Sequence, residues 1–152
     1  MQKWYKKNNN RSGNVLVSNK GASQAQKNFA AIDLGTNSCR LVIASPTPAS
    51  FRIVETFSKI TRLGEGIIND NELSRPAMRR TINALKVCAG VIEEYAPIYR
   101  SRFVATAACR RAKNCKEFLD LVKKETGLTI ETISSKEAVS YTHLRAHETR
   151  SN

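Results

Sequence analysis

The sequence predicts a single α/β domain, and three observations support that prediction. The chain has 152 residues with 41% hydrophobic content, which is the size and composition of one globular domain with a buried core. Short apolar runs alternate with two longer segments that repeat with helical periodicity. Their order is strand, strand, strand, helix, strand, helix, strand, without an internal repeat, so we expect a mixed five-stranded sheet.

The first three expected elements are strands. Residues 29–33 are a short apolar run that ends in a carboxylate, and residues 40–44 are a second apolar run. Residues 34–38 between them have the small and polar side chains of a turn, which indicates a hairpin. Residues 51–57 alternate in polarity and predict a third strand, which could extend to Leu63.

The longest expected element is a helix with clear signals at both ends. Ser74 is a good N-cap, and Pro76 falls in the first turn, where its missing N–H costs nothing. One apolar stripe with steps of four and three residues follows, made by Met78, Ile82, Leu85, Ala89, Ile92 and Ala96. Pro97 ends this helix, and residues 102–106 predict a fourth strand.

A second helix is expected after Asn114. Asn114 and Glu117 form a capping-box pattern at its start, and Gly127 is typical of a C-cap at its end. The side chains expected to face inward are Phe118, Leu121 and Val122. Residues 128–133 then predict the fifth strand.

The positive charge is unevenly distributed along the chain. The formal net charge is +12, and residues 1–28 hold six basic residues and no acidic one. Because this segment has few apolar side chains, we expect a flexible basic leader. The body, residues 29–138, is only mildly basic, which argues against a protein that binds a specific nucleic acid. Residues 139–152 lack periodicity and caps, and we expect a non-native or disordered tail there.

Two further features concern the cellular setting. The sequence has no run of about 18 apolar residues, so it predicts no membrane-spanning helix. The four cysteines are scattered and form no CxxC pair, which favours reduced thiols that pack in the core. We therefore expect a cytoplasmic protein that has no membrane partner.

The segment most informative about function lies between the first two strands. Asp33 ends a strand, where its carboxylate can hold Mg²⁺ or the waters around that ion. Gly35 lets the backbone approach an anion closely. Phosphate oxygens can accept hydrogen bonds from the side chains and N–H groups of Thr36, Asn37 and Ser38. The alternative is a plain hairpin in which asparagine and glycine serve to adopt a positive φ.

Basic side chains occur near turns at two more places. Thr106 ends the fourth expected strand and Arg110 and Arg111 follow it, where arginines at a strand end suit anion binding. A solvated loop of charges is the alternative. Arg62 precedes a glycine-containing segment, residues 63–66, which alone indicates only a turn.

Four segments of the chain resemble one known family. The segments are AIDLGTNS at 31–38, RLGEG at 62–66, ATAACRRAKN at 105–114, and the strand-like run that leads to Ser134. They occur over residues 29–138 in the order and spacing of the exopolyphosphatase / guanosine pentaphosphate phosphatase (Ppx/GppA) family. Four ordered matches are more specific than any single loop.

This resemblance implies a fold, a site and a set of partners. The fold would be a ribonuclease-H-like domain of the actin-like ATPase superfamily, the first of two such domains with the second missing, so that the fragment would be inactive alone. Residues 33–38 would form the first phosphate-binding loop, Arg110 would bind the phosphate chain, and Arg62 and Thr106 would also belong to the phosphate-binding site. The substrate would be polyphosphate or guanosine pentaphosphate, the cofactor Mg²⁺, and the full-length family a homodimer.

The resemblance also implies a glutamate after the fifth strand, which activates a water for attack on the terminal phosphate. Glu137 is the candidate, but it stands alone before Ala138 where the family has two successive glutamates, the second of them catalytic. Aligned without a gap, Ala138 takes the catalytic position. With a one-residue deletion, Glu137 takes it, and both alignments remain open.

Two other functions fit the sequence. One is a non-catalytic module that binds polyanions through the charge of the leader and the arginines. The other is a kinase relative of the same superfamily, which would transfer phosphate from ATP to a small acceptor.

Overall fold

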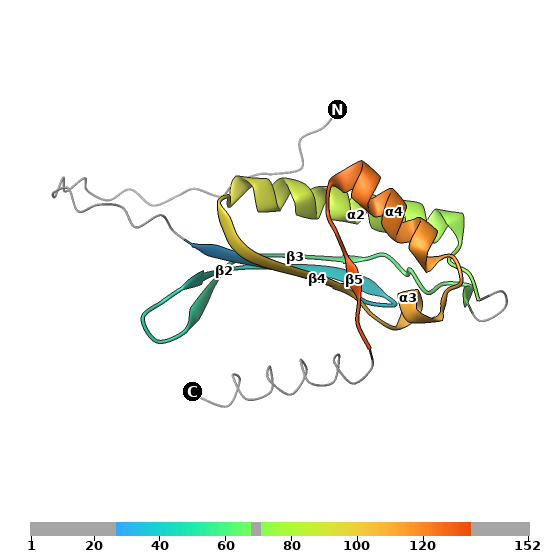
Figure 1. The fold of residues 1–152 in the computed structure, drawn as a ribbon, viewed down its shortest axis with the longest axis horizontal. Coiled ribbons are helices and arrows are strands. Elements are labelled where there is room, and N and C mark those ends of the chain that lie inside the picture. Colours follow the sequence, from blue (N-terminus) through green and yellow to red (C-terminus); the bar gives the residue numbers. More distant parts are fainter. Residues whose placement is uncertain (1–26, 68–70, 135–152) are drawn as a thin grey trace, which may run out of the picture.

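In the computed structural model, which describes residues 27–67 and 71–134, five strands form one sheet in the order β3-β2-β1-β4-β5 (Figure 1). The strands are β1 (Asn28–Leu34), β2 (Ser38–Pro46), β3 (Phe51–Ile60), β4 (Ile98–Ala105) and β5 (Glu131–Thr132). β1 is antiparallel to β2 and parallel to β4, so the sheet is mixed. The expected five-stranded sheet and the order of its strands and two long helices are confirmed.

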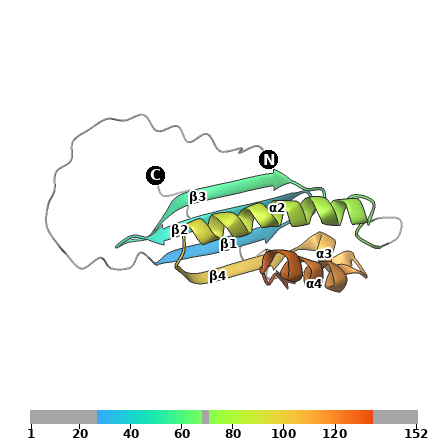
Figure 2. The same ribbon diagram turned by 90° about the horizontal axis from the view of Figure 1, so that it is seen from above.

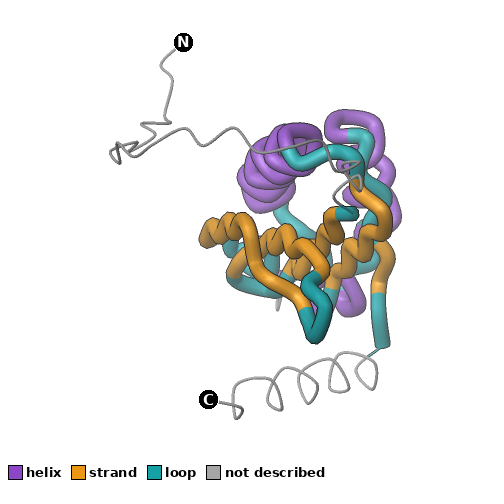
Figure 3. Tube along the Cα trace, turned by 90° about the vertical axis from the view of Figure 1, so that its left-hand side faces the viewer, coloured by secondary structure: helices purple, strands orange, loops and turns teal. Residues whose placement is uncertain are grey.

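Two helices cover one face of the sheet. α2 (Arg75–Glu94) and α4 (Cys115–Thr126) pack against each other on this face (Figures 2 and 3). A short helix, α3 (Ala107–Arg111), follows β4 and was not predicted from the sequence. Five residues are too few to show a helical period, which is why this segment reads as a loop.

The alternation of β1 separates the core from a polar face. Ala30, Ile32 and Leu34 are buried beneath the helices, whereas Asp33 between them is exposed. The helices complete the core with nearly inaccessible side chains, which are Ile82 and Leu85 from α2 and Phe118 and Val122 from α4. Asp33 therefore lies on the face opposite to α2 and α4.

The predicted ends of the two long helices are largely confirmed. Ser74 Oγ accepts a hydrogen bond from the Ala77 N–H at 3.3 Å, as an N-cap does. Gly127 ends α4 with a φ of 75°, a left-handed conformation that favours glycine. The prediction was wrong for Ala96, because α2 ends at Glu94 and Ala96 is exposed beyond it.

The capping box predicted at Asn114 is not formed. Asn114 is the N-cap residue of α4, but its side chain makes no capping hydrogen bond. It binds the backbone of Leu73 instead, with Oδ1 accepting from the Leu73 N–H at 2.8 Å and Nδ2 donating to the Leu73 carbonyl at 3.0 Å. This pair satisfies the peptide groups just before α2, so Asn114 joins the starts of the two helices.

Asn114→Ala is expected to destabilise the fold by about 1–3 kcal/mol, because the peptide groups of Leu73 lose both partners. Urea unfolding measures this change. Asn83→Ala is the matched control: Asn83 is exposed on α2, and alanine is the better helix former, so its stability should stay equal or rise slightly. Equal losses in the two variants would contradict a special role for Asn114.

The last two strands differ in length from the prediction. β4 begins earlier than expected, at Ile98, and ends before Thr106, which is the N-cap of α3. β5 has only two residues, which pair with the end of β4. Leu128 and Ile130 are buried outside any strand, so packing alone accounts for their apolar alternation.

The N-terminal boundary also differs slightly. β1 begins at Asn28, the last residue of the expected leader, and Asn28 is buried with its Nδ2 donating to the Tyr95 carbonyl at 2.8 Å. Residues 1–26 of that leader, the expected tail at 139–152 and Glu137 lie outside the described residues.

All four cysteines are free and buried, which confirms their expected role as core residues. Cys39 Sγ and Cys88 Sγ lie 3.9 Å apart, and the hydrogen bond between them, together with burial, raises the pKa of Cys88. Within the described residues, no helix is both long and apolar enough to cross a membrane. The cytoplasmic location stays a prediction.

Candidate functional site

The segment between β1 and β2 is a tight turn. The Gly35 N–H donates to the Ser38 carbonyl at 2.9 Å, and the sheet resumes at once with Leu34 facing Cys39. Gly35 and Asn37 are not among the described residues with positive φ, so the turn does not need them for a left-handed conformation. The segment is thus a hairpin turn that does not require glycine or asparagine for its backbone conformation, which leaves its polar side chains available for binding.

A second loop lies directly against this turn. The N–H groups of Thr61 and Arg62 both donate to the Asn37 carbonyl, at 2.9 and 3.0 Å, and the Gly64 N–H donates to the Thr36 carbonyl at 3.0 Å. The sequence separates the two segments by the whole of β2 and β3. Their backbones are nevertheless held together at the end of the sheet.

Gly64 makes this close approach possible. A Cβ atom at Gly64 would lie 2.4 Å from Thr36 Cγ2 and 3.7 Å from the Cβ of Ala108 in α3. Three segments that were singled out separately in the sequence therefore meet at Gly64. Only a residue without a side chain fits between them in this arrangement.

The third of these segments starts at Thr106. Its N–H donates to the Leu34 carbonyl at 3.0 Å, and its Oγ1 donates to the same carbonyl at 3.4 Å. Thr106 therefore fixes the start of α3 beside the turn that follows β1. Its hydroxyl proton already has an acceptor, so a phosphate would have to compete with the Leu34 carbonyl for it.

Arg110 extends from α3 towards the end of β5. Its Nη1 donates to the Ile133 carbonyl at 2.7 Å, and the residue is exposed overall. It lines a surface pocket of about 640 Å³ together with Lys116 and Lys123 from α4. Asp120 also lines the pocket and pairs with Lys116 Nζ at 3.0 Å, so the excess positive charge comes from Arg110 and Lys123. Two excess cations at one pocket favour an anionic ligand.

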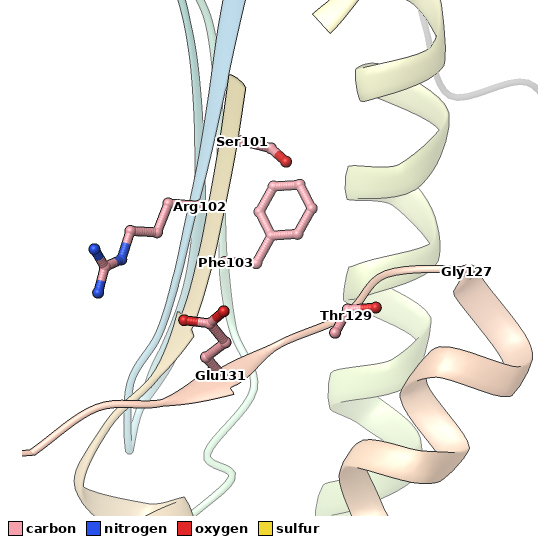
Figure 4. A pocket seen from close by; sticks show the side chains of 6 residues that line it. All are labelled: Ser101, Arg102, Phe103, Gly127, Thr129 and Glu131. Carbon is pink, nitrogen blue, oxygen red and sulfur yellow. The ribbon is translucent and has the colours of Figure 1, made fainter. Parts of the chain in front are cut away.

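A second pocket lies away from these loops. It has a volume of about 580 Å³ and is lined by Ser101, Arg102, Phe103, Gly127, Thr129 and Glu131 (Figure 4). In Figure 4 the Arg102 side chain lies on the side of β4 away from α2, and Phe103 lies on the side of α2. The pocket lies between β4 and the segment that leads from α4 into β5, and it includes none of the residues predicted for the site.

The donor chemistry near Asp33 fits Mg²⁺ in one of its common binding modes. Asp33 is an exposed carboxylate beside the turn, with Arg40 and Val104 as its neighbours across the sheet. The described residues contain no cluster of three or more acidic, histidine or cysteine side chains. Mg²⁺ often binds through one carboxylate, waters and substrate phosphates, and Asp33 suits that mode.

Sequence reasoning located most of this site but missed two residues. Gly64 read only as part of a turn, although it is the point of contact of the three segments. Arg80 on α2, which binds the loop of Arg62, was not singled out from the sequence. Its partners are 18 and 19 residues away, so no local pattern could have indicated it.

Comparisons with known proteins agree with the resemblance seen in the sequence. The sequence model of the Ppx/GppA phosphatase family matches residues 42–150. A crystal structure of the Aquifex aeolicus member of the Ppx/GppA family is 37% identical, with a TM-score of 0.70 over 73% of this chain and 36% of that one. An exopolyphosphatase-like protein is 36% identical, with a TM-score of 0.69 over 75% of this chain and 34% of that one.

A third solved structure extends the likeness to a more distant protein. An exopolyphosphatase from Cytophaga hutchinsonii is 26% identical, with a TM-score of 0.67 over 70% of this chain and 34% of that one. The chain thus spans about a third of the length of the solved structures that it matches. The expected ribonuclease-H-like fold is confirmed by these similarities and by the sheet order.

Proposed function

Because the chain belongs to the Ppx/GppA phosphatase family, we propose that it forms one wall of the active site of a phosphoanhydride hydrolase. The substrate is inorganic polyphosphate or guanosine pentaphosphate, from which the enzyme releases the terminal phosphate. One observation carries the proposal, which is the meeting of the Asp33 turn, the Arg62 loop and α3 around Gly64. The contacts bring the residue types that suit phosphate binding to one end of the sheet.

The site offers the groups that phosphate binding needs. Hydroxyl and amide groups of Thr36, Asn37 and Ser38 donate to phosphate oxygens, and the guanidinium of Arg110 pairs with the chain of phosphates. Such donors stabilise the charge that spreads over the phosphoryl oxygens in the transition state. Mg²⁺, held by Asp33, would offset the charge of the condensed phosphate.

Glu137 takes the part of general base in this proposal. Its carboxylate accepts a proton from a water as the water oxygen forms a bond to the terminal phosphorus. The bond from that phosphorus to the bridging oxygen breaks, and its electron pair stays on the shortened chain. The products are inorganic phosphate and a chain one phosphate shorter, and positioning accounts for most of the catalysis.

Tripolyphosphate binding tests the proposal on the chain itself. Isothermal titration calorimetry should show binding that Mg²⁺ strengthens and that Asp33→Ala loses. Since the chain spans about a third of its solved relatives, phosphate release from long-chain polyphosphate should be close to background. Rapid turnover by this chain alone would contradict the idea that it supplies only one wall.

Salt dependence separates this function from binding by charge alone. A module that holds polyanions through its basic leader should lose affinity steeply with added salt, independently of Asp33. A built site should keep a Mg²⁺-dependent component that Asp33→Ala removes at every salt concentration. If Asp33→Ala binds as well as the wild type with Mg²⁺ present, the non-catalytic module is the better description.

A further inference from the structure

Arg80 is a residue of α2 that binds one of the site loops at three points. Its Nε donates to the Thr61 carbonyl at 3.0 Å, and its Nη2 donates to the Arg62 carbonyl at 3.4 Å. The same Nη2 forms an ion pair with Glu65 Oε2 at 2.5 Å. One guanidinium thus contacts Thr61, Arg62 and Glu65, three residues of the loop that contains Gly64.

The opposite side of the same backbone is held by the Asp33 turn. The N–H groups of Thr61 and Arg62 donate to Asn37, while their carbonyls accept from Arg80. Arg62 has a φ of 49°, a left-handed conformation that is costly for a residue with a side chain. Such a conformation persists only where surrounding contacts stabilise it. Here the N–H groups of Thr61 and Arg62 are bonded to Asn37 and their carbonyls to Arg80.

We propose that Arg80 is a positioning residue for the phosphate site. It keeps the segment from Thr61 to Glu65 against the Asp33 turn, so that Arg62 and Gly64 stay in place beside Thr36. Arg80 itself does not touch the substrate. The proposal rests on the proposed function, because it assigns Arg80 a part in binding condensed phosphate.

The neighbouring arginine provides a matched control. Arg79 lies one residue earlier on α2 and donates through Nη1 to both oxygens of Glu125 on α4, each at 2.9 Å. Its side chain is 57% exposed and that of Arg80 is 42% exposed. Both residues are arginines on α2 and each pairs with a glutamate, but of the two only Arg80 binds the loop of Arg62.

Hydrogen exchange tests the positioning role without any ligand. In Arg80→Ala, the amides of Thr61, Arg62 and Gly64 should exchange about tenfold faster, because the loop opens more often. In Arg79→Ala these amides should keep the wild-type rates. Unchanged exchange in Arg80→Ala, or equal acceleration in both variants, would overturn the proposal.

Binding of tripolyphosphate tests its consequence for the site. Arg80→Ala should weaken binding about tenfold, Arg79→Ala should not, and methylguanidinium added to Arg80→Ala should restore part of the affinity. Arg80→Lys should behave like Arg80→Ala, because an ammonium group cannot reach three acceptors with the geometry of a fork. Full affinity in Arg80→Lys would show that charge alone suffices and would refute positioning.

A double-mutant cycle with Arg62 separates positioning from direct contact. If Arg80 acts through Arg62, then Arg80→Ala should cost little further affinity in an Arg62→Ala background. Additive losses in affinity, together with unchanged amide exchange at Gly64 in Arg80→Ala, would mean that Arg80 binds the ligand itself and would refute the proposal. If the wild type does not bind tripolyphosphate, the proposed function fails, and the positioning role is then decided by the exchange rates alone.

Discussion

Gly64→Ala is expected to weaken tripolyphosphate binding about 10- to 100-fold and to lower stability by about 1–3 kcal/mol. The new Cβ would lie 2.4 Å from Thr36 Cγ2, a distance that real contacts do not show. The next nearest atoms, at 3.5 and 3.7 Å, are at ordinary contact distances, so rotation of the Thr36 side chain would relieve most of the clash. That rotation also moves the Thr36 hydroxyl, which is why binding should weaken together with folding.

A second substitution at Thr36 distinguishes this explanation from a general disturbance of the loop. Serine has a hydroxyl but no Cγ2, so Thr36→Ser should remove the clash that Gly64→Ala creates. The double variant should regain most of the affinity and stability lost in Gly64→Ala. If the double variant remains as weak as the single one, the Thr36 hydroxyl is not what Gly64 protects.

Gly90→Ala is the control for the loss of a glycine as such. Gly90 lies within α2, it is exposed, and a Cβ there would meet no atom within 4 Å. Alanine should therefore stabilise the helix by about 0.5–1 kcal/mol and leave tripolyphosphate binding unchanged. Urea unfolding and calorimetry on the three variants provide the comparison.

The sequence predicts elements well where the signals are local. Ser74 and Gly127 mark helix ends through their own side-chain and backbone chemistry, and both predictions hold. The strand predicted at 29–33 is present, and its alternation places Asp33 on the face opposite to its buried neighbours. These features depend on residues within a few positions of each other.

The errors occur where a distant segment changes the outcome. Asn114 has the pattern of a capping box, but the backbone of Leu73, 41 residues away, takes its side chain. The contact of Gly64 with Thr36 depends on how β2 and β3 return the chain to the same end of the sheet. Patterns of single residues carry no information about such meetings, so the sequence indicates the loops but not their arrangement.

Substitution of Arg110 in the candidate site should affect both tripolyphosphate binding and the backbone at the end of β5. Its Nη1 already binds the Ile133 carbonyl at 2.7 Å, while the residue remains exposed beside a pocket with two lysines. A guanidinium has five N–H donors, so it can hold that carbonyl and a phosphate oxygen at the same time. A lysine has one nitrogen and cannot span both acceptors in the same planar geometry.

Arg110→Ala should therefore weaken tripolyphosphate binding about 10- to 100-fold, the value of a charge-assisted hydrogen bond, and flatten the salt dependence. Arg110→Lys should recover the salt dependence, because it restores the charge, but only part of the affinity. Hydrogen exchange at Ile133 and Ser134 should report whether the end of β5 loosens in each variant. The measurement bears on the proposed general base, because Glu137 follows Ser134 by three residues in the sequence.

Arg111→Ala is the control, since Arg111 is the exposed neighbour of Arg110 on the same short helix. Arg111→Ala removes the same charge from α3. It should therefore reproduce only the loss of affinity that comes from long-range electrostatic attraction, and added salt screens that attraction. At high salt the two variants should therefore diverge, with Arg111→Ala returning to the wild-type affinity and Arg110→Ala staying weak. If they remain alike at every salt concentration, Arg110 contributes charge but no direct contact, and the phosphate lies elsewhere along the edge of the sheet.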